Sequence, residues 1–275
     1  MSIITLTTDL GTKDYLVASI KGLLLQQIPT IQIVDVTHQL SSDNYIQTAY
    51  LCSNTIKNFP DGTIHFILNN VFEYYPTEIL IASFKNQLIV CSNNGLLTMI
   101  TDEVPENVYS IPFEITTNIS LLEFVKKAVV AISKIIKNDS LESFASKSKN
   151  VIIKNNLSPA IFENSIEGHI IFIDNHENVV VNISKEIFEK GRKNRNFKIV
   201  FQRQEIIETL NMNYEAKDSD KIAYFNSADL LEIAVINGNA ASLFGLSNLS
   251  DNLEKSMEQI IQNMQYYQRV IIYFE

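Results

Sequence analysis

The first 45 residues place carboxylates where a ligand could bind. The alternating apolar run 3–8 ends in Asp9, and Asp14 comes five residues later, directly before a segment with helical spacing. A carboxylate at the carboxyl end of the first strand stands where open α/β sheets bind their ligands. The same residue type is also a common helix cap. Residue types alone therefore leave two roles open for Asp9, ligand binding and helix capping.

Cysteine and histidine give weaker signals. Cys52 and Cys91 lie inside apolar stretches without CxxC spacing, so we expect buried free thiols rather than a disulfide or a zinc site. No His/carboxylate cluster has the spacing of metal ligands, and no metal is expected. His38 and His65 come at the ends of expected strands, which favours structural roles. His176 adjoins Asp174 in an expected turn, where a solvated ring is the plainer interpretation.

The elements that must position these residues alternate in the first half of the chain. Apolar spacing predicts helices over 15–27, 45–59 and 121–137, and strands over 3–8, 31–38, 63–68, 79–84 and 87–91. Residues 92–97 predict a turn because Asn and Gly tolerate positive φ. Alternating strands and helices favour a central, mostly parallel sheet covered on both faces. We expect an N-terminal α/β domain over residues 1–150.

The second half has a different character. Short apolar segments predict strands over 168–174, 179–183, 197–201, 221–225, 231–236 and 269–274. Strands of this length and spacing are typical of a small β domain, a barrel or a sandwich, over residues 158–275. Apolar residues on one face predict one more helix over 250–267.

Composition limits the classes of partner. At 275 residues with 46% hydrophobic content, the chain is long enough for two domains. Its 31 acidic and 22 basic residues give a formal charge of -9, which repels a phosphate backbone, so nucleic acid is not an expected partner. No apolar run approaches the ~20 residues needed to span a bilayer, and no signal peptide begins the sequence. We expect a cytoplasmic protein without a membrane partner.

Four blocks in a fixed order resemble the S-adenosylmethionine (SAM) hydrolases, or SAM hydroxide adenosyltransferases, a family that includes the fluorinases and chlorinases. The blocks are Thr-Thr-Asp-Leu-Gly-Thr-Lys-Asp at 7–14, Ser-Asn-Asn-Gly-Leu-Leu at 92–97, the residues at 173–178 with 182–183, and those at 225–227 with 231–234. The resemblance implies an N-terminal α/β domain, a C-terminal β-barrel and a homotrimer. It also implies that a nucleoside binds between neighbouring subunits, with SAM as substrate and no separate cofactor.

The resemblance also implies roles for individual residues. It assigns substrate binding to Asp9 (ribose hydroxyls), Asp14, Asp174 and Ser227 (amino-acid end), Asn178, Asn239 and Ala240 (adenine end), and Asn94. A carboxylate suits hydroxyl and ammonium groups, and an amide suits a purine edge because it both donates and accepts. Without the resemblance, Asp174 and Asn178 also fit a plain turn, and Ser227 fits a local cap.

Two motifs of the family are missing, and both concern the nucleophile. The family carries Asp-Pro-Gly-Val-Gly-Thr with a following Arg, where this chain has Asn70 and then Val-Phe-Glu-Tyr-Tyr. It also carries Phe-His-Gly-Arg-Asp, where this chain has residues 120–127 without His or Arg. An Asn cannot accept a proton as an Asp can. The catalytic candidates at these positions are Asn70, Ser120 and Glu123, and the nearby carboxylates Glu73 and Glu78 are either substitutes or exposed charges.

Three functions remain to be separated. The leading hypothesis is transfer of the adenosyl group of SAM to water, which gives adenosine and methionine. The alternative is a catalytically inactive protein of the same fold that binds a nucleoside or SAM. A halide-using transferase with a pocket near Ser120 ranks lower, because the Thr-Phe-Tyr-Ser run of the halogenases is missing.

Overall fold

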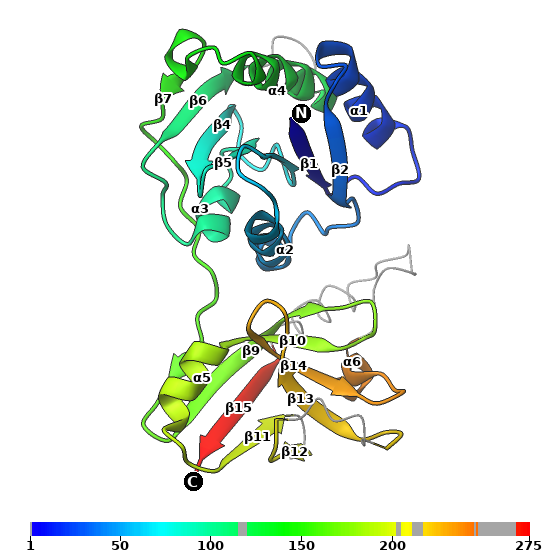
Figure 1. The fold of residues 1–275 in the computed structure, drawn as a ribbon, viewed down its shortest axis with the longest axis vertical. Coiled ribbons are helices and arrows are strands. Elements are labelled where there is room, and N and C mark those ends of the chain that lie inside the picture. Colours follow the sequence, from blue (N-terminus) through cyan, green and yellow to red (C-terminus); the bar gives the residue numbers. More distant parts are fainter. Residues whose placement is uncertain (1, 115–119, 202–204, 211–216, 245, 247–267) are drawn as a thin grey trace. The chain divides into compact units, whose positions relative to one another are not determined.

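The computed structural model describes residues 2–114, 120–201, 205–210, 217–244, 246 and 268–275. The chain divides into two compact units, residues 1–156 and residues 157–275, called the first and second unit below (Figure 1). The expected helix over 250–267 lies outside the described residues. Among the described residues, no helix is long and apolar enough to cross a membrane.

The first unit is built on a seven-stranded sheet with the order β2-β1-β3-β5-β4-β6-β7. The strands are β1 (Ile3–Thr8), β2 (Gln32–Thr37), β3 (Ile64–Leu68), β4 (Thr77–Phe84), β5 (Gln87–Ser92), β6 (Val108–Phe113) and β7 (Ser146–Lys147). β2, β1, β3 and β5 are parallel neighbours. β4 runs antiparallel to β5 and β6, and β7 runs antiparallel to β6. The prediction of a mostly parallel sheet is confirmed.

Helices cover both faces of this sheet (Figure 1). They are α1 (Leu16–Gln27), α2 (Tyr45–Asn58), α3 (Leu96–Thr101) and α4 (Leu121–Ile136), followed by a 3₁₀ turn at Leu141–Ser143. Alternate residues of a strand point to opposite faces. Accordingly, Phe66 of β3 belongs to the core beneath α1 and α4, whereas the next residue, Ile67, belongs to the core beneath α2 and α3. Cys52 and Cys91 lie in the second of these cores as free thiols.

His65 has a structural role, as expected. Its Nε2 lies 2.6 Å from Oε1 of Gln87, and its Nδ1 lies 2.7 Å from the Thr5 hydroxyl. The Gln87 amide donates to the carbonyls of Ile56 and Phe59, so its Oε1 must accept from Nε2–H, and Nδ1 accepts from Thr5. Burial lowers the pKa of His65, which favours this neutral ring.

The second unit is a curled antiparallel sheet, a half-barrel, with the order β12-β11-β15-β9-β10-β14-β13 and β8 beside β9. The strands are β8 (Ala160–Ile161), β9 (Ser165–Ile173), β10 (Val179–Ser184), β11 (Phe197–Phe201), β12 (Glu205–Ile207), β13 (Lys221–Phe225), β14 (Leu230–Val235) and β15 (Arg269–Phe274). The two ends of the order approach each other, because Leu210 after β12 bridges to Ala223 of β13. Two short helices, α5 (Lys185–Arg192) and α6 (Ala240–Leu243), complete the unit.

Two short helices differ from the sequence prediction. Residues 92–97 were expected to form a turn, but the turn ends at Gly95, whose φ is +91°, and α3 begins at Leu96. All six residues of α3 are buried, so the segment lacks the polar face that gives helices their periodic signal. α5 was not predicted. It begins after Ser184, whose side chain caps it by accepting from the N–H of Ile187.

Candidate functional site

Polar residues of the first unit gather where β1, β3 and β5 end. Asp9 follows β1, Asn69 and Asn70 follow β3, and Asn93 and Asn94 follow β5. These three strands are parallel neighbours, so their carboxyl ends meet at one edge of the sheet. Ligand sites of open α/β sheets form at this edge.

Asp9 is tied to the loop after β3. Its Oδ2 accepts a hydrogen bond from the backbone N–H of Asn70 at 2.8 Å. It does not cap α1, because the N-cap residue of this helix is Tyr15, and the N–H of Leu16 donates to Asp14 at 2.9 Å rather than to Asp9. Helix capping is therefore the wrong interpretation of Asp9. Burial raises the pKa of Asp9 and the charge of Asp43 adds to the rise, while the Asn70 N–H opposes it.

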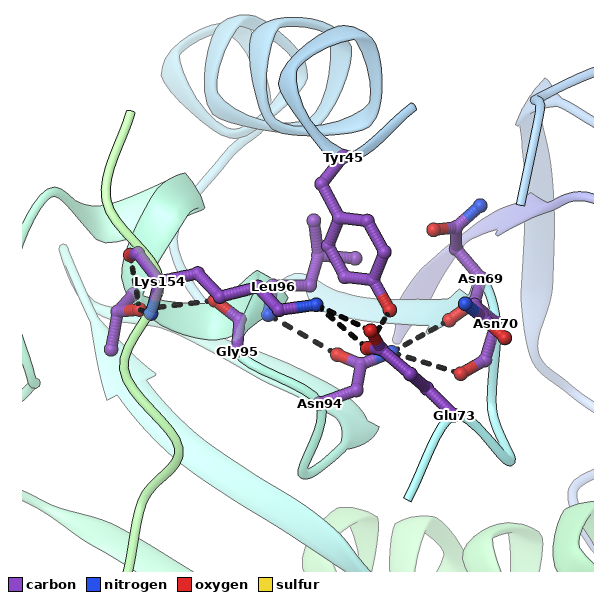
Figure 2. Close-up of polar contacts among 9 residues, drawn as sticks. Tyr45, Asn69, Asn70, Glu73, Asn94, Gly95, Leu96 and Lys154 are labelled. Atoms are coloured by element: carbon purple, nitrogen blue, oxygen red, sulfur yellow. Dashed lines mark hydrogen bonds and ion pairs between the residues drawn. The ribbon is translucent and has the colours of Figure 1, made fainter. Parts of the chain in front are cut away.

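Asn94 holds the same loop from the side of β5. Its amide group donates to the carbonyls of Asn69 at 2.9 Å and Asn70 at 3.1 Å, and its Oδ1 accepts from the N–H of Leu96 at 3.1 Å (Figure 2). The side chain is buried and makes these three contacts at once. In this structure, Asn94 positions the loop that carries Asn70.

A charged group lies in the loop after β3. The carboxylate of Glu73 accepts from the Tyr45 hydroxyl, and both of its oxygens contact Nζ of Lys154, at 2.8 and 2.7 Å (Figure 2). The Lys154 ammonium also lies 3.7 Å from the centre of the Tyr45 ring. The side chains of Lys154 and Glu73 are 26% and 27% exposed. Burial, followed by the Glu73 hydrogen bond and charge, raises the pKa of Tyr45.

The backbone around Lys154 is fixed by the start of α3. The Thr98 hydroxyl accepts from the Lys154 N–H at 3.0 Å and donates to the Lys154 carbonyl at 2.8 Å. A Cβ at Gly95 would lie 2.5 Å from Cγ of Lys154, so only glycine leaves room for the lysine stem. Sequence reasoning did not single out Lys154, because it lies 81 residues from Glu73 and in no motif.

The catalytic candidates from the sequence are dispersed. Asn70 adopts a positive φ of 42° and uses its backbone to bind Asp9 and Asn94. Ser120 precedes α4 without a capping hydrogen bond from its side chain. Glu123 is exposed on α4 and pairs with Lys126 at 2.6 Å. The structure therefore brings Asn70, but not Glu123, into the polar group with Asp9.

In the second unit, Asp174 and Asn178 meet in the turn between β9 and β10. Asp174 Oδ1 accepts from the N–H groups of His176 and Asn178, both at 2.8 Å, and its Oδ2 accepts from the Asn178 amide at 3.1 Å. His176 is exposed. The turn therefore presents an acid and an amide that already share a hydrogen bond.

Glu232 is a buried carboxylate that sequence reasoning missed. Its Oε1 accepts from the Tyr224 hydroxyl and from the Asn178 amide at 3.2 Å, and its Oε2 accepts from the Asn226 amide at 2.9 Å. Only 7% of the residue is exposed. Burial is the main cause of the raised pKa of Tyr224, and the hydrogen bond to Glu232 and the charge of that carboxylate raise it further. A signal existed in the sequence, since a lone acid inside the apolar strand Leu230–Val235 needs partners.

The last segment reaches the same turn. The N–H of Ala241 donates to the carbonyl of Glu177 at 2.9 Å, which brings Asn239 and Ala240 beside residues 174–178. Asn239 caps α6 through its Oδ1, and Ala240 is fully buried. Ser227 is exposed in the turn between β13 and β14.

Metal binding finds no support in these groups. Within the described part of the chain, no three His, Cys, Asp or Glu side chains are grouped so that they could hold a metal ion. The donors that do gather are carboxylates, amides and one ammonium, a set that suits hydroxyl groups, amines and purine edges.

Sequence comparisons match both units. Residues 4–136 match the SAM hydroxide adenosyltransferase N-terminal domain, and residues 168–251 match the C-terminal domain of the same name. The chain is 23% identical over 260 residues to the (R)-S-adenosyl-L-methionine hydrolase of Methanocaldococcus jannaschii, covering 91% of this chain and 95% of the relative. It is also 39% identical to the fluorinase of an Actinoplanes species over 62 residues, or 22% of this chain and 21% of the relative.

Solved structures share the fold. A conserved protein of Thermotoga maritima gives a TM-score of 0.77 at 18% identity and covers 99% of this chain and 100% of its own. A conserved hypothetical protein of Thermus thermophilus gives 0.69, also at 18% identity, with full coverage of both chains. Both likenesses extend over the two units.

Proposed function

Because the chain belongs to the SAM hydroxide adenosyltransferase family, we propose that it hydrolyses SAM to adenosine and methionine. The observation that carries this function is the placement of Asp9. The carboxylate stands at the carboxyl edge of the sheet, is half-buried, and is held by the N–H of Asn70 rather than by a helix. A carboxylate has about four acceptor positions, so Asp9 retains capacity for the two hydroxyls of a ribose.

The second unit supplies groups of matching chemistry. Asp174 and Ser227 offer acceptors for the ammonium of the methionine part, with Asp14 of the first unit. Asn178 and the backbone at Asn239 and Ala240 offer donors and acceptors for the adenine. The shared hydrogen bonds of Asp174, Asn178 and Glu232 support this assignment because they fix the turn before any ligand arrives.

The reaction is a displacement at C5′ of the substrate. The oxygen of water attacks C5′, the C5′–S bond breaks, and its electron pair stays on sulfur, so methionine leaves as a neutral thioether. The water loses one proton. Because the leaving group needs no protonation, the site has to orient and deprotonate water, and no separate cofactor is part of the scheme.

We extend the same assignment to a homotrimer with nucleoside sites shared between subunits. The assigned groups come from both units of the chain, and the family resemblance supports a shared site. Light scattering of the purified protein tests this assembly. A mass of three chains is expected, and a monomer that hydrolyses SAM at the full rate contradicts it.

Titration and product analysis test the activity. Calorimetry with SAM, adenosine and ADP, followed by chromatography of the SAM mixture, should show SAM binding and equal amounts of adenosine and methionine. Asp9→Ala should weaken the binding of both SAM and adenosine. If saturating SAM releases no adenosine above its spontaneous breakdown, the hydrolase assignment is wrong.

Two observations favour a second candidate, a SAM-binding or nucleoside-binding protein without turnover. Asn70 stands where the family has an Asp, and Glu123 is occupied by an exposed ion pair with Lys126. Binding of SAM without product formation identifies this candidate. An adenosine affinity that does not change in Asp9→Ala excludes both functions at this site.

A further inference from the structure

The proposed hydrolysis needs a group that takes a proton from water, but Asn70 cannot accept a proton as a carboxylate can, and Glu123 is held in an exposed ion pair with Lys126. We propose that Glu73, held by Lys154 and Tyr45, orients the attacking water and accepts its proton. This inference rests on the proposed function and adds a residue that the family motifs do not contain. Two features of the structure support it: the loop after β3, which carries Glu73, and Lys154, whose ammonium contacts the Glu73 carboxylate.

Glu73 belongs to the same loop as Asn70, whose backbone N–H donates to Asp9. The N–H of Glu73 donates to the carbonyl of Asn70 at 3.2 Å, and the N–H of Asn70 donates to Asp9 at 2.8 Å. The two carboxylates are thus fixed through one residue, at the edge of the sheet where a ligand binds. A ribose bound to Asp9 would therefore lie beside the loop that carries Glu73.

The Glu73 carboxylate has room for a water molecule. It accepts one hydrogen bond from Tyr45 and two contacts from the Lys154 ammonium, out of about four acceptor positions. Its side chain is 27% exposed, so solvent reaches it. One acceptor position is therefore left for water while the other three hold the carboxylate in place.

Lys154 is fixed before any substrate arrives. Thr98 holds its backbone on both sides, and the stem passes over Gly95. The ammonium lies against the Tyr45 ring and on Glu73. A cation fixed in this way provides positive charge beside the reacting water without the entropy cost that weakens mobile surface pairs.

Two other glutamates among the described residues lack this support. The Glu123–Lys126 pair on α4 has side chains that are 59% and 53% exposed, and its partners lie three residues apart on one helix. Glu142 also accepts from a tyrosine, Tyr109, but this pair is exposed and has the Ser140 hydroxyl rather than a lysine as its further partner. Glu73 alone among these three joins the ligand edge of the sheet.

The step conserves atoms and charge. The water oxygen forms its bond to C5′ while the C5′–S bond breaks, and the sulfur of SAM changes from a sulfonium to a neutral thioether. The proton of the water passes to Glu73 and then to solvent through the exposed part of the side chain. Adenosine and methionine leave, and the carboxylate is restored.

The test compares Glu73→Gln and Lys154→Met with two matched controls. Glu142→Gln removes the carboxylate of the exposed Tyr109 pair, and Lys198→Met removes a lysine that pairs with Glu275 in the second unit. Both site variants should bind SAM within about twofold of the wild type. Glu73→Gln should lower kcat about 100-fold with KM nearly unchanged, the size typical of a lost general base. The controls should keep the wild-type kcat.

Chemical rescue separates a proton acceptor from a structural residue. In Glu73→Ala, added formate can enter the space of the partly exposed carboxylate and should restore a measurable part of kcat. Acetamide, which is neutral, should restore none. If the wild type turns over and Glu73→Gln does so equally fast, this inference is wrong and the hydrolase function stands. A wild type that binds SAM without releasing adenosine overturns both.

Discussion

The Tyr45–Glu73 pair of the first unit and the Tyr224–Glu232 pair of the second both have a tyrosine that donates to a glutamate, but they differ in what surrounds the acid. Glu73 has a lysine, Lys154, as its further partner, and about a quarter of its side chain is exposed. The further donors to Glu232 among the described residues are neutral, the amides of Asn178 and Asn226, and the residue is 7% exposed. The first acid retains contact with water, whereas the second is enclosed.

The difference in exposure and in hydrogen-bond partners indicates different functions for the two glutamates. A buried carboxylate whose partners are all neutral amides and hydroxyls stabilises its network only while every donor is satisfied, and it fixes the shape of a recognition surface. A partly exposed carboxylate with a fixed cation can exchange protons with water. We therefore assign recognition to the Glu232 network and proton transfer to the Glu73 group.

The sharpest test of this contrast is removal of each carboxylate. Glu232→Ala should lower the free energy of unfolding by about 2–4 kcal/mol, because three partly buried donors lose the buried carboxylate that accepts from them. Glu73→Ala should cost about 1 kcal/mol or less, because water replaces the lost partner. Urea unfolding followed by circular dichroism measures both. Equal costs would remove the distinction between the enclosed and the open pair.

Asp9 is intermediate between the two glutamates, because it is half-buried and accepts from a backbone N–H, that of Asn70, rather than from a lysine. Asp9→Asn keeps an oxygen for the N–H of Asn70 but removes the charge, so SAM should bind about 10- to 100-fold more weakly, the value of a hydrogen bond to a charged group. Titration calorimetry at pH 7 measures the loss. An unchanged affinity would place the ribose elsewhere.

The raised pKa of Asp9 predicts a pH dependence with a defined sign. The pKa of Asp9 in the folded protein lies above the usual value near 3.9, so protonated Asp9 is compatible with folding and ionised Asp9 is disfavoured by burial. The free energy of unfolding therefore falls as the pH rises through the folded-state pKa of Asp9. Asp9→Asn should therefore be as stable as the wild type, or more so, at pH 7. The affinity for SAM should fall in acid from a higher pH than an ordinary Asp would give, and Asp9→Asn should lack this loss.

Gly95 tests whether Lys154 has to lie where it does. Gly95→Ala forces a side chain into a φ of +91° and against the lysine stem, so it should cost about 1–2 kcal/mol of unfolding free energy and lower the rate of adenosine release. The matched control is Gly22→Ala in α1, where a Cβ meets nothing within 4 Å and should be neutral or stabilising. Full activity in Gly95→Ala would mean that the reaction does not depend on the position of Lys154.

The smallest expected effect comes from the two tyrosine hydroxyls. Tyr224→Phe should cost about 1 kcal/mol, because it leaves the enclosed Glu232 one donor short. Tyr45→Phe should cost less than about 0.5 kcal/mol, because Glu73 keeps Lys154 and the ring still faces the ammonium. Thermal unfolding of both variants under one buffer condition ranks them. The reverse order would contradict the comparison.

The sequence was informative where a local pattern determines the structure. The helices and most strands of the first unit follow from apolar spacing, because each buries one stripe or one face. Asp9 was identified because a strand end is a local signal. α3 was missed since its six residues are all buried and have no polar face.

The sequence named Glu73 among the carboxylates that could substitute for the missing motif, but the pairing of Glu73 with Lys154 could not be predicted in the same way. Glu73 and Lys154 lie 81 residues apart, and neither belongs to a motif that implies the other. Their meeting depends on Gly95 and Thr98 at the start of α3, a helix that the spacing did not reveal. Long-range pairs of this kind arise from tertiary packing, which single-sequence patterns do not contain.

The most direct measurement follows the oxygen of water. Purified protein is incubated with SAM in water enriched in oxygen-18, and the adenosine is analysed by mass spectrometry. Hydrolysis at C5′ predicts adenosine that carries the label at its 5′ oxygen, formed in equal amount with methionine and about 100-fold more slowly by Glu73→Gln. Adenosine release no faster than in the absence of protein would contradict the account.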